Sequence, residues 1–261
     1  MTDPRATSPP APSSPPAQGD PPTQSAAQRL AGVRARIAAA CAEADRDPAE
    51  ITLIAVGKGI AAGRVAEILA LGVTELGENK AQEAATKAAD IASLQPEPAA
   101  RWHFIGQLQR NKARIVTGFA SMVHSVDRPA LVVALDRAAA PRRQPLEVLL
   151  QLDLDPNPNP DPTRGGADPQ DLAALADAVL GVEHLTLRGL MTVAPPGVDA
   201  RRAFDRLVGY SQVLQAIQPS ATVISAGMSG DLEAAISAGA THVRVGTALF
   251  GARKLASEHR S

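Results

Sequence analysis

The chain has 261 residues with a formal net charge of -1, and 45% of its residues are hydrophobic and 20% charged. This is the composition of a soluble globular protein, and about 250 residues is a common length for one barrel domain. The near-neutral charge offers no general attraction for nucleic acid or for an anionic membrane surface. No apolar run approaches the roughly 20 residues that cross a bilayer, and the N-terminus lacks a secretory signal pattern. We therefore expect a cytoplasmic protein with neither nucleic acid nor membrane as a partner.

Residues 1–24 consist mostly of Pro, Ser, Ala, Thr and Gln, which provide too little apolar surface to offset the entropy lost on ordering. We predict a disordered tail there. Order is expected to begin at Ser25, which forms an S-x-x-Q capping pattern with Gln28 at the start of a helix. One face of this helix carries Leu30, Val33, Ile37 and Cys41, the only cysteine, which we interpret as a small packed hydrophobe.

Beyond this helix, short runs of branched apolar residues alternate with alanine-rich amphipathic segments, as in βα units around a parallel sheet. Eight such units favour a closed (β/α)8 TIM barrel over a doubly wound open sheet, and no G-x-G-x-x-G follows the first strand. We predict that the barrel covers residues 25–254 and that 255–261 form a C-terminal tail. The predicted strands are Ile51–Val56, Val73–Leu76, Trp102–Ile105, Met122–His124, Leu146–Leu152, Thr186–Leu190, Thr222–Ser225 and His242–Val245.

Lys58 follows directly on the first predicted strand, so we expect it at the C-terminal rim of the barrel, where this fold carries its active sites. Partial desolvation at a strand end disfavours the ammonium form of a lysine. The neutral amine can then attack an aldehyde and form a Schiff base. The alternative is a lysine whose side chain simply extends from the strand end into solvent.

The loops at residues 225–231 and 244–247 follow the seventh and eighth predicted strands, and each opens a predicted helix. Loops at these two places, with the backbone N–H groups of the helix starts, are the recurrent phosphate site of TIM barrels. Ser229 can add a hydroxyl donor, and Gly246 lets the backbone approach a phosphate oxygen closely. The alternative is that these glycines and Ser229 only cap helices.

Arg244 ends the eighth predicted strand, next to the predicted phosphate loops. An arginine there can hydrogen-bond the pyridine nitrogen of a cofactor, and it keeps that nitrogen unprotonated because the guanidinium holds its own proton. Such a ring is a weak electron sink, and enzymes that stabilise a full carbanion usually place a carboxylate at this position. The alternative is an ion pair between Arg244 and Asp231 or another rim carboxylate.

Two more predicted rim segments, residues 77–83 and 103–112, are densely polar. We expect Asn79 and His103 to contact ring substituents of a cofactor. The alternatives are that Asn79 caps the helix that follows it and that His103 is a hydrogen-bonded core residue. The side chains expected to order these two segments are Glu78, Gln82, Gln109 and Lys112.

These motifs resemble the YggS/PROSC family of pyridoxal phosphate homeostasis proteins from about residue 25 to residue 253. The resemblance implies the fold of the N-terminal barrel of alanine racemase. It also implies a role in supplying, buffering or transferring pyridoxal 5′-phosphate (PLP) and in balancing vitamin B6 and amino-acid pools, with no established catalytic reaction. The motifs are Val56-Gly-Lys58, Gly77-Glu-Asn79, Gln82-Glu83, His103-Phe-Ile-Gly106, Leu108-Gln109, Asn111-Lys112, His124-Ser-Val-Asp127, Arg188-Gly-Leu-Met191, Gly227-Met-Ser229, Asp231, Val243-Arg-Val-Gly-Thr247, Phe250-Gly251 and Arg253.

For the site, the resemblance implies PLP held as a Schiff base on Lys58, with Arg244 at the ring nitrogen. It implies phosphate contacts from Ser229, Gly246 and Thr247. Apo forms of PLP-dependent enzymes are the protein partners that it suggests. The predicted PLP site in full is Lys58, Asn79, His103, Met228, Ser229, Arg244, Gly246 and Thr247, with no metal ligand.

Three positions depart from the family pattern. Gly57 stands where the family usually has serine, and Ala226 stands where it has methionine. After the fifth predicted strand, Arg164-Gly-Gly166 replaces a common K-x-G, which leaves no lysine there for a carried-over role in holding or exchanging PLP. We interpret the surrounding loop, residues 153–168, as an exposed flexible connector.

A racemase of this fold needs a second acid/base on the face opposite the lysine, which in alanine racemase is a tyrosine from an added domain. Tyr210, the only tyrosine of this chain, falls in the helix of the sixth βα unit, outside the barrel. We therefore expect a monomeric PLP carrier without a second catalytic base, and not an enzyme. The alternatives are a PLP-dependent racemase or decarboxylase of low activity and, less favoured, a Schiff-base aldolase acting on a phosphosugar.

Overall fold

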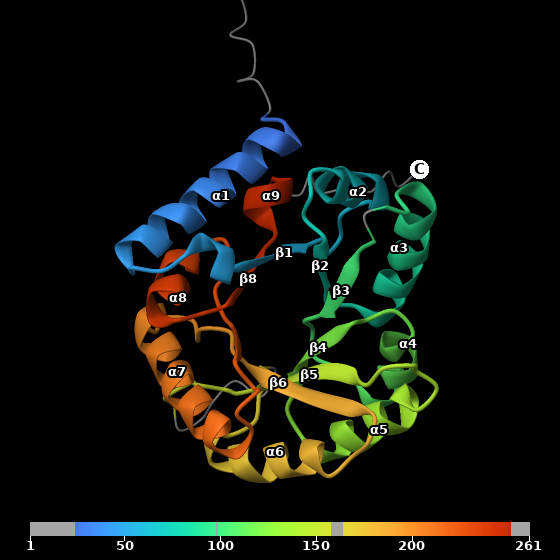
Figure 1. Ribbon diagram of the computed structural model, residues 1–261, viewed down its shortest axis with the longest axis vertical. Helices are drawn as coiled ribbons and strands as arrows, with labels where there is room; N and C mark the ends of the chain where they lie inside the picture. Colours follow the sequence, from blue (N-terminus) through green and yellow to red (C-terminus); the bar gives the residue numbers. More distant parts are fainter. Residues whose placement is uncertain (1–23, 98, 158–163, 252–261) are drawn as a thin grey trace, which may run out of the picture.

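The computed structural model describes residues 24–97, 99–157 and 164–251. Within them eight parallel strands close into a barrel in sequential order, and β1 pairs with β8 to complete the ring. Figure 1 looks along the barrel and shows the helices as an outer ring. The predicted (β/α)8 TIM barrel is thus confirmed. The strands are β1 (Thr52–Val56), β2 (Glu75–Glu78), β3 (Arg101–Phe104), β4 (Met122–Val126), β5 (Leu146–Gln151), β6 (Leu185–Met191), β7 (Val223–Ser225) and β8 (His242–Val245).

Helices α2 to α9 belong to the βα units, whereas α1 precedes the barrel and lies across its outside against α8 and α9 (Figure 1). No helix in the described part of the chain is long and apolar enough to cross a membrane. Short 3-10 helices cover Pro48–Glu50, Arg110–Lys112 and Pro169–Asp171. The α-helices are α1 (Ala26–Glu43), α2 (Ala62–Ala70), α3 (Ala81–Leu94), α4 (Ala113–Thr117), α5 (Pro129–Ala139), α6 (Leu172–Leu180), α7 (Ala200–Ile217), α8 (Leu232–Ala238) and α9 (Thr247–Phe250).

Helix α1 begins as predicted. The backbone N–H of Gln28 donates to Ser25 Oγ over 3.2 Å, and the Ser25 N–H donates to Gln28 Oε1 over 2.8 Å, which completes the capping box. Cys41 is fully buried with the apolar face of α1, as expected of a small packed hydrophobe. Of the predicted tail, only Gln24 is among the described residues, and the predicted segment 255–261 lies outside them.

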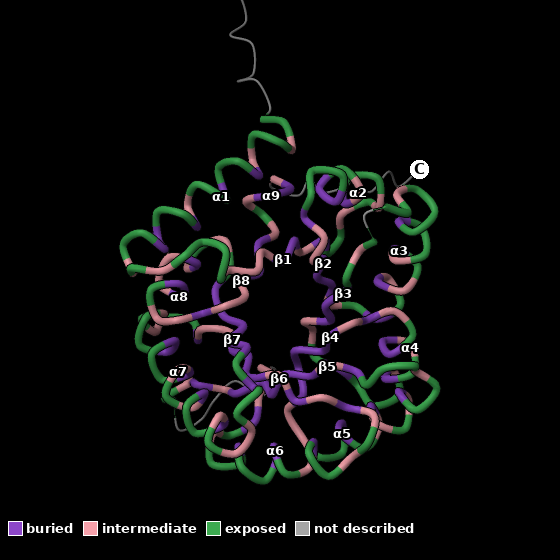
Figure 2. The backbone as a smooth tube through the Cα atoms, in the orientation of Figure 1, coloured by how far each residue is buried: buried purple, intermediate pink, exposed green. Residues whose placement is uncertain are grey.

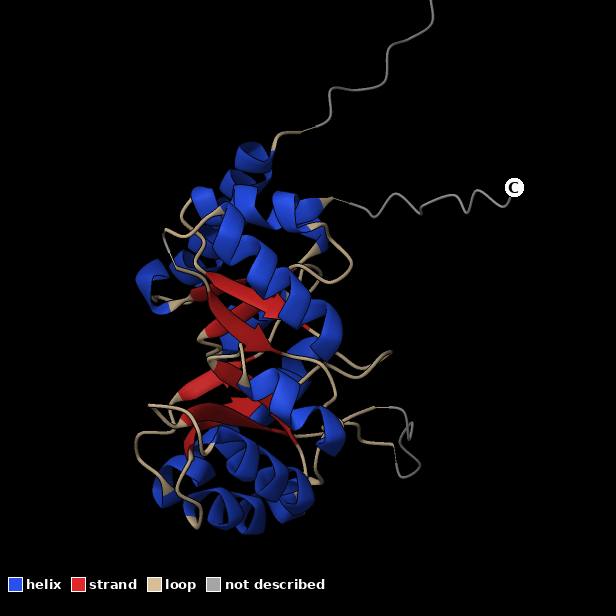
Figure 3. Cartoon of the chain, turned by 90° about the vertical axis from the view of Figure 1, so that its right-hand side faces the viewer, coloured by secondary structure: helices blue, strands red, loops and turns tan. Residues whose placement is uncertain are grey.

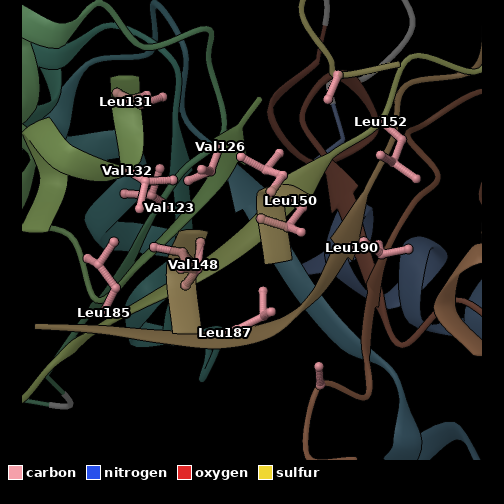
Figure 4. Close-up of a cluster of buried hydrophobic side chains, with 14 of the residues drawn as sticks. Val123, Val126, Leu131, Val132, Val148, Leu150, Leu152, Leu185, Leu187 and Leu190 are labelled. Atoms are coloured by element: carbon pink, nitrogen blue, oxygen red, sulfur yellow. The ribbon is translucent and has the colours of Figure 1, made fainter. Parts of the chain in front are cut away.

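The main hydrophobic core lies between the outer face of the sheet and the helices. Figure 4 shows Val123, Val148 and Leu187 of three neighbouring strands together with Leu131 and Val132 of α5. In Figure 2 the strands and the inward sides of the helices are the buried parts of the chain. Because side chains alternate along a strand, the residues between these positions face the inside of the barrel.

The inside of the barrel is only partly apolar. A small apolar cluster there consists of Met122, Leu149, Met191 and Val223. Other inward positions, on β3, β4, β7 and β8, carry polar side chains that are almost completely buried, namely His103, His124, Ser225 and Arg244. Figure 3 shows the strands from the side with their arrowheads at one end of the barrel, which is the rim where the candidate site is expected.

Strand β2 begins two residues later than predicted. Val73 is buried as its apolar character suggests, but its N–H donates to Ile68 O at the end of α2 and so belongs to the turn. Pairing with β3 starts at Glu75 and continues through Glu78. The strand therefore carries two acidic residues that a search for apolar runs does not select.

Candidate functional site

Lys58 lies in the turn directly after β1, and its side chain is exposed. The partial desolvation predicted for it is therefore wrong. The reason is local, because the Ile60 N–H closes a turn onto Gly57 O over 2.9 Å and Gly59 takes a left-handed φ of 67°. This turn lifts Lys58 off the strand end. No hydrogen bond or ion pair joins its amine to another described residue, so the side chain is free to reach over the rim.

The backbone on both sides of Lys58 is fixed by helix α3. Lys87 Nζ donates to the carbonyl oxygen of Gly57 over 2.6 Å, and Glu83 Oε1 accepts from the N–H of Gly59 over 2.8 Å. Glu83 and Lys87 are one helical turn apart, so one face of α3 supplies both anchors. The structure thus combines a rigid backbone at residue 58 with an unrestrained amine.

Beneath this turn lies a buried ion pair between Lys87 and Glu78, whose side chains are 6% and 0% exposed. Burial raises the pKa of the Glu78 carboxyl above its ordinary value, and the neighbouring Lys87 ammonium opposes that rise. A Cβ atom on Gly57 would lie 3.0 Å from Glu78 Oε1 and 3.0 Å from Val65 Cγ2. Glycine at this departure from the family pattern therefore leaves room for the ion pair.

Asn79 follows β2 at the same rim, and its Oδ1 is buried without a hydrogen-bond partner among the described residues. It does not cap α3, whose N-cap position is Lys80 and has no side-chain cap. Gly106 fixes the Asn79 backbone from the next strand end, since a Cβ there would lie 2.2 Å from Asn79 O. A buried amide oxygen without a donor is costly in a protein alone, so this group fits a ligand that brings a donor.

The loops after β7 and β8 lie side by side. Ser229, half-buried after β7, accepts through Oγ a 3.4 Å hydrogen bond from the N–H of Ala248 in α9. Gly246 is the N-cap of α9, and Thr247 is its exposed first residue. Met228 is 39% exposed at the same edge. The structure therefore brings the four predicted residues of these loops together at one part of the rim.

Arg244 is 4% exposed and lies inside the barrel just below these loops. Its Nη1 donates to Ser225 Oγ over 2.7 Å, and its Nη2 donates to Thr192 O over 2.8 Å. The alternative ion pair with Asp231 is not formed, because Asp231 Oδ1 instead accepts from the N–H of Met228 over 2.6 Å. Burial lowers the pKa of Arg244 to about 10, with the charge of Asp231 acting against that change, so the guanidinium stays protonated at neutral pH.

His103 is a core residue, and its predicted contact with a cofactor ring is wrong. It is 1% exposed, with Nδ1 2.8 Å from His124 Nε2 and Nε2 2.5 Å from Glu75 Oε2. Both ring nitrogens are thus used by the strands on either side of β3. The alternative considered for this residue, a hydrogen-bonded core histidine, is the one confirmed.

The described ends of the loop 153–168 are tied to the barrel, so the predicted exposure of this loop is wrong for 153–155 and 164–167, whereas 156, 157 and 168 are exposed as predicted. Arg164 Nη2 donates to Val193 O over 3.0 Å, and Gln151 Nε2 donates to Gly165 O over 2.6 Å. The intervening 158–163 lies outside the described residues. The arginine that replaces the family's lysine here binds the end of β6.

Some residues that support the candidate site were not predicted from the sequence. Lys87 had a detectable signal, because it lies between Ala84 and Ile91 on the buried stripe of α3, where an unpaired lysine would be costly. No side-chain hydrogen bond links Gln82, Gln109 or Lys112 to another described residue. In the segment 103–112, Arg128 Nη2 instead donates to Leu108 O over 2.7 Å. Tyr210 is on α7, outside the barrel, as predicted.

Comparison with known proteins supports one family. Residues 30–254 match the model of the alanine racemase N-terminal domain. The chain is 41% identical over 227 residues to a pyridoxal phosphate homeostasis protein of Pseudomonas aeruginosa, covering 87% of this chain and 95% of that protein. For the protein of the same name in Escherichia coli K12 the identity is 37% over 230 residues, with 87% and 96% covered.

Solved structures agree with this. PipY of Synechococcus elongatus PCC7942 with PLP bound is 36% identical and superposes with a TM-score of 0.75, covering 87% of this chain and 100% of PipY. The alanine racemase of Streptomyces coelicolor A3(2) is 22% identical with a TM-score of 0.61, covering 86% of this chain and 59% of the racemase. The likeness to the racemase concerns the fold alone.

Proposed function

Because the chain belongs to the family of pyridoxal phosphate homeostasis proteins built on the alanine racemase N-terminal domain, we propose that it binds PLP and acts in PLP homeostasis. One feature of the rim carries this proposal. The pairing of β1 with β8 sets Gly246 beside Val56, two residues before Lys58, and a Cβ on Gly246 would lie 3.2 Å from Val56 O. A free amine, a phosphate loop and a buried arginine thus come from two adjacent strand ends.

In this proposal each residue has a separate task. Lys58 would hold PLP as a Schiff base: PLP would supply the aldehyde, and the amine of Lys58, once its ammonium proton had passed to solvent, would condense with it and release one water. Ser229 and the N–H groups of Gly246 and Thr247 bind the phosphate. Arg244 donates to the ring nitrogen.

Two further rim residues would complete the site. The amide of Asn79 meets a ring substituent, which supplies the hydrogen bond that its buried Oδ1 lacks within the described residues. Met228 contributes apolar surface at the edge of the site, where it is 39% exposed.

We further propose a carrier role without turnover of amino acids. The support is the guanidinium of Arg244, which leaves the ring nitrogen unprotonated and so a weak electron sink, together with the position of Tyr210 on α7, outside the barrel. An exposed Lys58 suits loading and unloading, because water, amino acids or an acceptor protein can reach it. The proposal includes a monomeric, cytoplasmic protein whose partners are apo forms of PLP-dependent enzymes, and size-exclusion chromatography tests the monomer.

The test is the visible spectrum of the purified protein with PLP, before and after borohydride reduction, with mass analysis of the peptide that contains residue 58. We expect reduction to trap the cofactor on Lys58 and Lys58→Ala to abolish the adduct without changing the melting temperature. The matched control is Lys80→Ala, which removes an exposed lysine from the neighbouring strand end. An adduct that persists in Lys58→Ala would show that another amine is used.

Two further measurements separate the carrier from its rivals. Arg244→Glu is expected to change the absorption of bound PLP by permitting protonation of the ring nitrogen, and a spectrum equal to the parent's would exclude that contact. Racemisation or decarboxylation of amino acids by the parent protein at enzymatic rates would favour the enzyme alternative. A protein that takes up no PLP but cleaves a phosphosugar would favour the aldolase.

A further inference from the structure

A continuous line of hydrogen bonds crosses the inside of the barrel from one end to the other. Arg244 Nη1 lies 2.7 Å from Ser225 Oγ, and Ser225 Oγ lies 2.9 Å from His124 Nδ1. His124 Nε2 lies 2.8 Å from His103 Nδ1, and His103 Nε2 lies 2.5 Å from Glu75 Oε2. These five side chains come from β8, β7, β4, β3 and β2, and we call them the interior chain.

With Glu75 a carboxylate and both imidazoles neutral, the interior chain has one direction, because only one assignment of its protons then satisfies all four contacts, whereas a charged His103 would allow the reverse direction at His124. An arginine can only donate, so Ser225 accepts from Arg244 and gives its own hydroxyl proton to Nδ1 of His124. His124 then carries its proton on Nε2 and donates to Nδ1 of His103. His103 in turn donates from Nε2 to the carboxylate of Glu75. In this assignment both histidines carry their proton on Nε2 and lie between a cation and an anion.

The electrostatics of the two ends agree with this assignment. Burial by itself would raise the pKa of Glu75, but the hydrogen bond from His103 and the charge of Arg101 lower it below its ordinary value. Burial drives the pKa of His124 well below its usual range, and the charge of Arg244 lowers it further. A carboxylate at one end and neutral imidazole at His124 are what the assignment requires.

The Glu75 end of the interior chain opens at the N-terminal mouth of the barrel, opposite the candidate site. Glu75 is 19% exposed, and its Oε1 lies 3.7 Å from Arg101 Nη1. Arg101 also pairs with Glu147 over 3.0 Å, and Glu147 pairs with Arg188 over 3.1 Å. The charged and titratable groups that face the interior chain are thus Glu75, Arg101, Glu147, Arg188 and His242 at the mouth, His103 and His124 in the middle, and Arg244 at the rim.

We propose that Ser225, His124, His103 and Glu75 are positioning residues for Arg244, and that through it the carboxylate at the far mouth of the barrel sets how PLP is held. The inference rests on the proposed function, since it assigns Arg244 to the ring nitrogen. Ser225 accepts one N–H of Arg244 and Thr192 O accepts another, which fixes the plane of the guanidinium. Glu75 anchors the opposite end, so the hydroxyl proton of Ser225 always points away from Arg244.

The direction of the interior chain is tested first in the protein without PLP, by long-range ¹H–¹⁵N correlation spectra of histidine-labelled samples at neutral pH. We expect His103 and His124 both to be neutral with the proton on Nε2. A charged imidazole or an Nδ1–H tautomer at His124 would overturn the proposal. This measurement does not depend on PLP. A parent protein that takes up no PLP would therefore refute the proposed function and leave the result for the histidine tautomers unaffected.

The coupling to Arg244 is tested by PLP titration of Ser225→Ala, Glu75→Gln and the double variant, read both as affinity and as the pH profile of the absorption of bound PLP. Ser225→Ala removes a hydrogen bond to a charged group, and we expect PLP binding to weaken about ten- to a hundred-fold. Glu75→Gln should weaken it several-fold and shift the pH profile. Ser225→Thr, which keeps the hydroxyl, should restore most of the affinity.

The double variant separates positioning from a general loss of stability. If Glu75 acts on Arg244 through Ser225, then Glu75→Gln has no further effect in the Ser225→Ala background. The control is His242→Gln, which replaces a histidine whose ring centroid lies 6.3 Å from that of His103 but which is not part of the interior chain. It should leave the His124 tautomer and PLP affinity unchanged. Losses that multiply in the double variant, or an equal loss in His242→Gln, would overturn the proposal.

Discussion

Replacing Lys87 with methionine should be among the most destabilising single changes near the rim. It removes the ammonium from Glu78, whose side chain is fully buried, and it removes the donor from Gly57 O, 2.6 Å away. Breaking a buried ion pair by deleting one partner costs about 3–5 kcal/mol, because a charge is left buried without compensation. The contact with Glu83 is 3.4 Å long and that carboxyl is 33% exposed, so it adds little.

Urea unfolding at neutral pH measures this cost. A loss of about 4 kcal/mol with a slope of about 2–3 kcal/mol per molar urea lowers the midpoint by about 1 to 2 M. The matched control is Lys80→Met, which removes an exposed lysine from the N-cap of the same helix and should change the free energy of unfolding by less than about 0.5 kcal/mol. Covalent capture of PLP by Lys58 should also slow in Lys87→Met, since the Gly57 carbonyl is no longer held.

A second substitution shows whether the buried Glu78 carboxylate causes this loss of stability. In the Lys87→Met, Glu78→Leu variant the buried carboxylate is gone, and we expect stability to recover by about 2 kcal/mol or more relative to Lys87→Met alone. The Gly57 carbonyl still lacks its donor, so the recovery is incomplete. If the losses in free energy of unfolding of Lys87→Met and Glu78→Leu simply add in the double variant, then Glu78 and Lys87 do not form the pair described.

Three further outcomes are expected. In Gly106→Ala the new Cβ would lie 2.2 Å from the carbonyl oxygen of Asn79, so we expect thermal unfolding to show a loss of about 1–3 kcal/mol and PLP binding to weaken. The control is Gly209→Ala in helix α7, where nothing lies within 4 Å of the new Cβ and we expect a gain of about 0.5–1 kcal/mol. Burial lowers the pKa of His242 from 6.5 to about 4 in the folded protein. Between these two pH values the unfolded chain therefore binds a proton at His242 that the folded protein does not bind. The free energy of unfolding should therefore drop by about 3 kcal/mol as the pH falls from 6.5 to about 4. In His242→Gln, the free energy of unfolding measured with urea should change less over the same pH range. Arg36→Ala, which breaks an exposed bidentate pair with α8 and a 2.9 Å bond to the loop after β7, should cost about 1 kcal/mol in the same assay and leave the parent fold intact.

The barrel itself was predictable because its signals are periodic and repeated. Each strand has an apolar outer face that packs on a helix, and eight repeats of this pattern fix the architecture even where the ends of a strand are misplaced. The start of β2 shows the limit. Val73 is apolar and buried but serves a turn, whereas Glu78 is charged and buried within the strand. Apolar character alone identifies burial, and the hydrogen-bond ladder decides the strand.

The residues of the candidate site were predictable where position along the chain is enough. Lys58, Arg244 and the loops after β7 and β8 follow strand ends, and the fold brings strand ends to one rim. His103 was misassigned because a histidine within a strand faces either the rim or the interior, and the choice depends on partners from other strands. Those partners, Glu75 and His124, are 28 and 21 residues away in sequence.

Two different parts of the fold therefore support the candidate site, one at Lys58 and the other at Arg244. Helix α3 holds the backbone around Lys58 from outside the barrel, through Glu83 and Lys87, while the amine itself is left free. The interior chain holds Arg244 from within the barrel and leaves it almost no freedom. In the proposed function, a fixed Arg244 beside an accessible Lys58 would hold PLP in one orientation and leave its covalent link open to exchange.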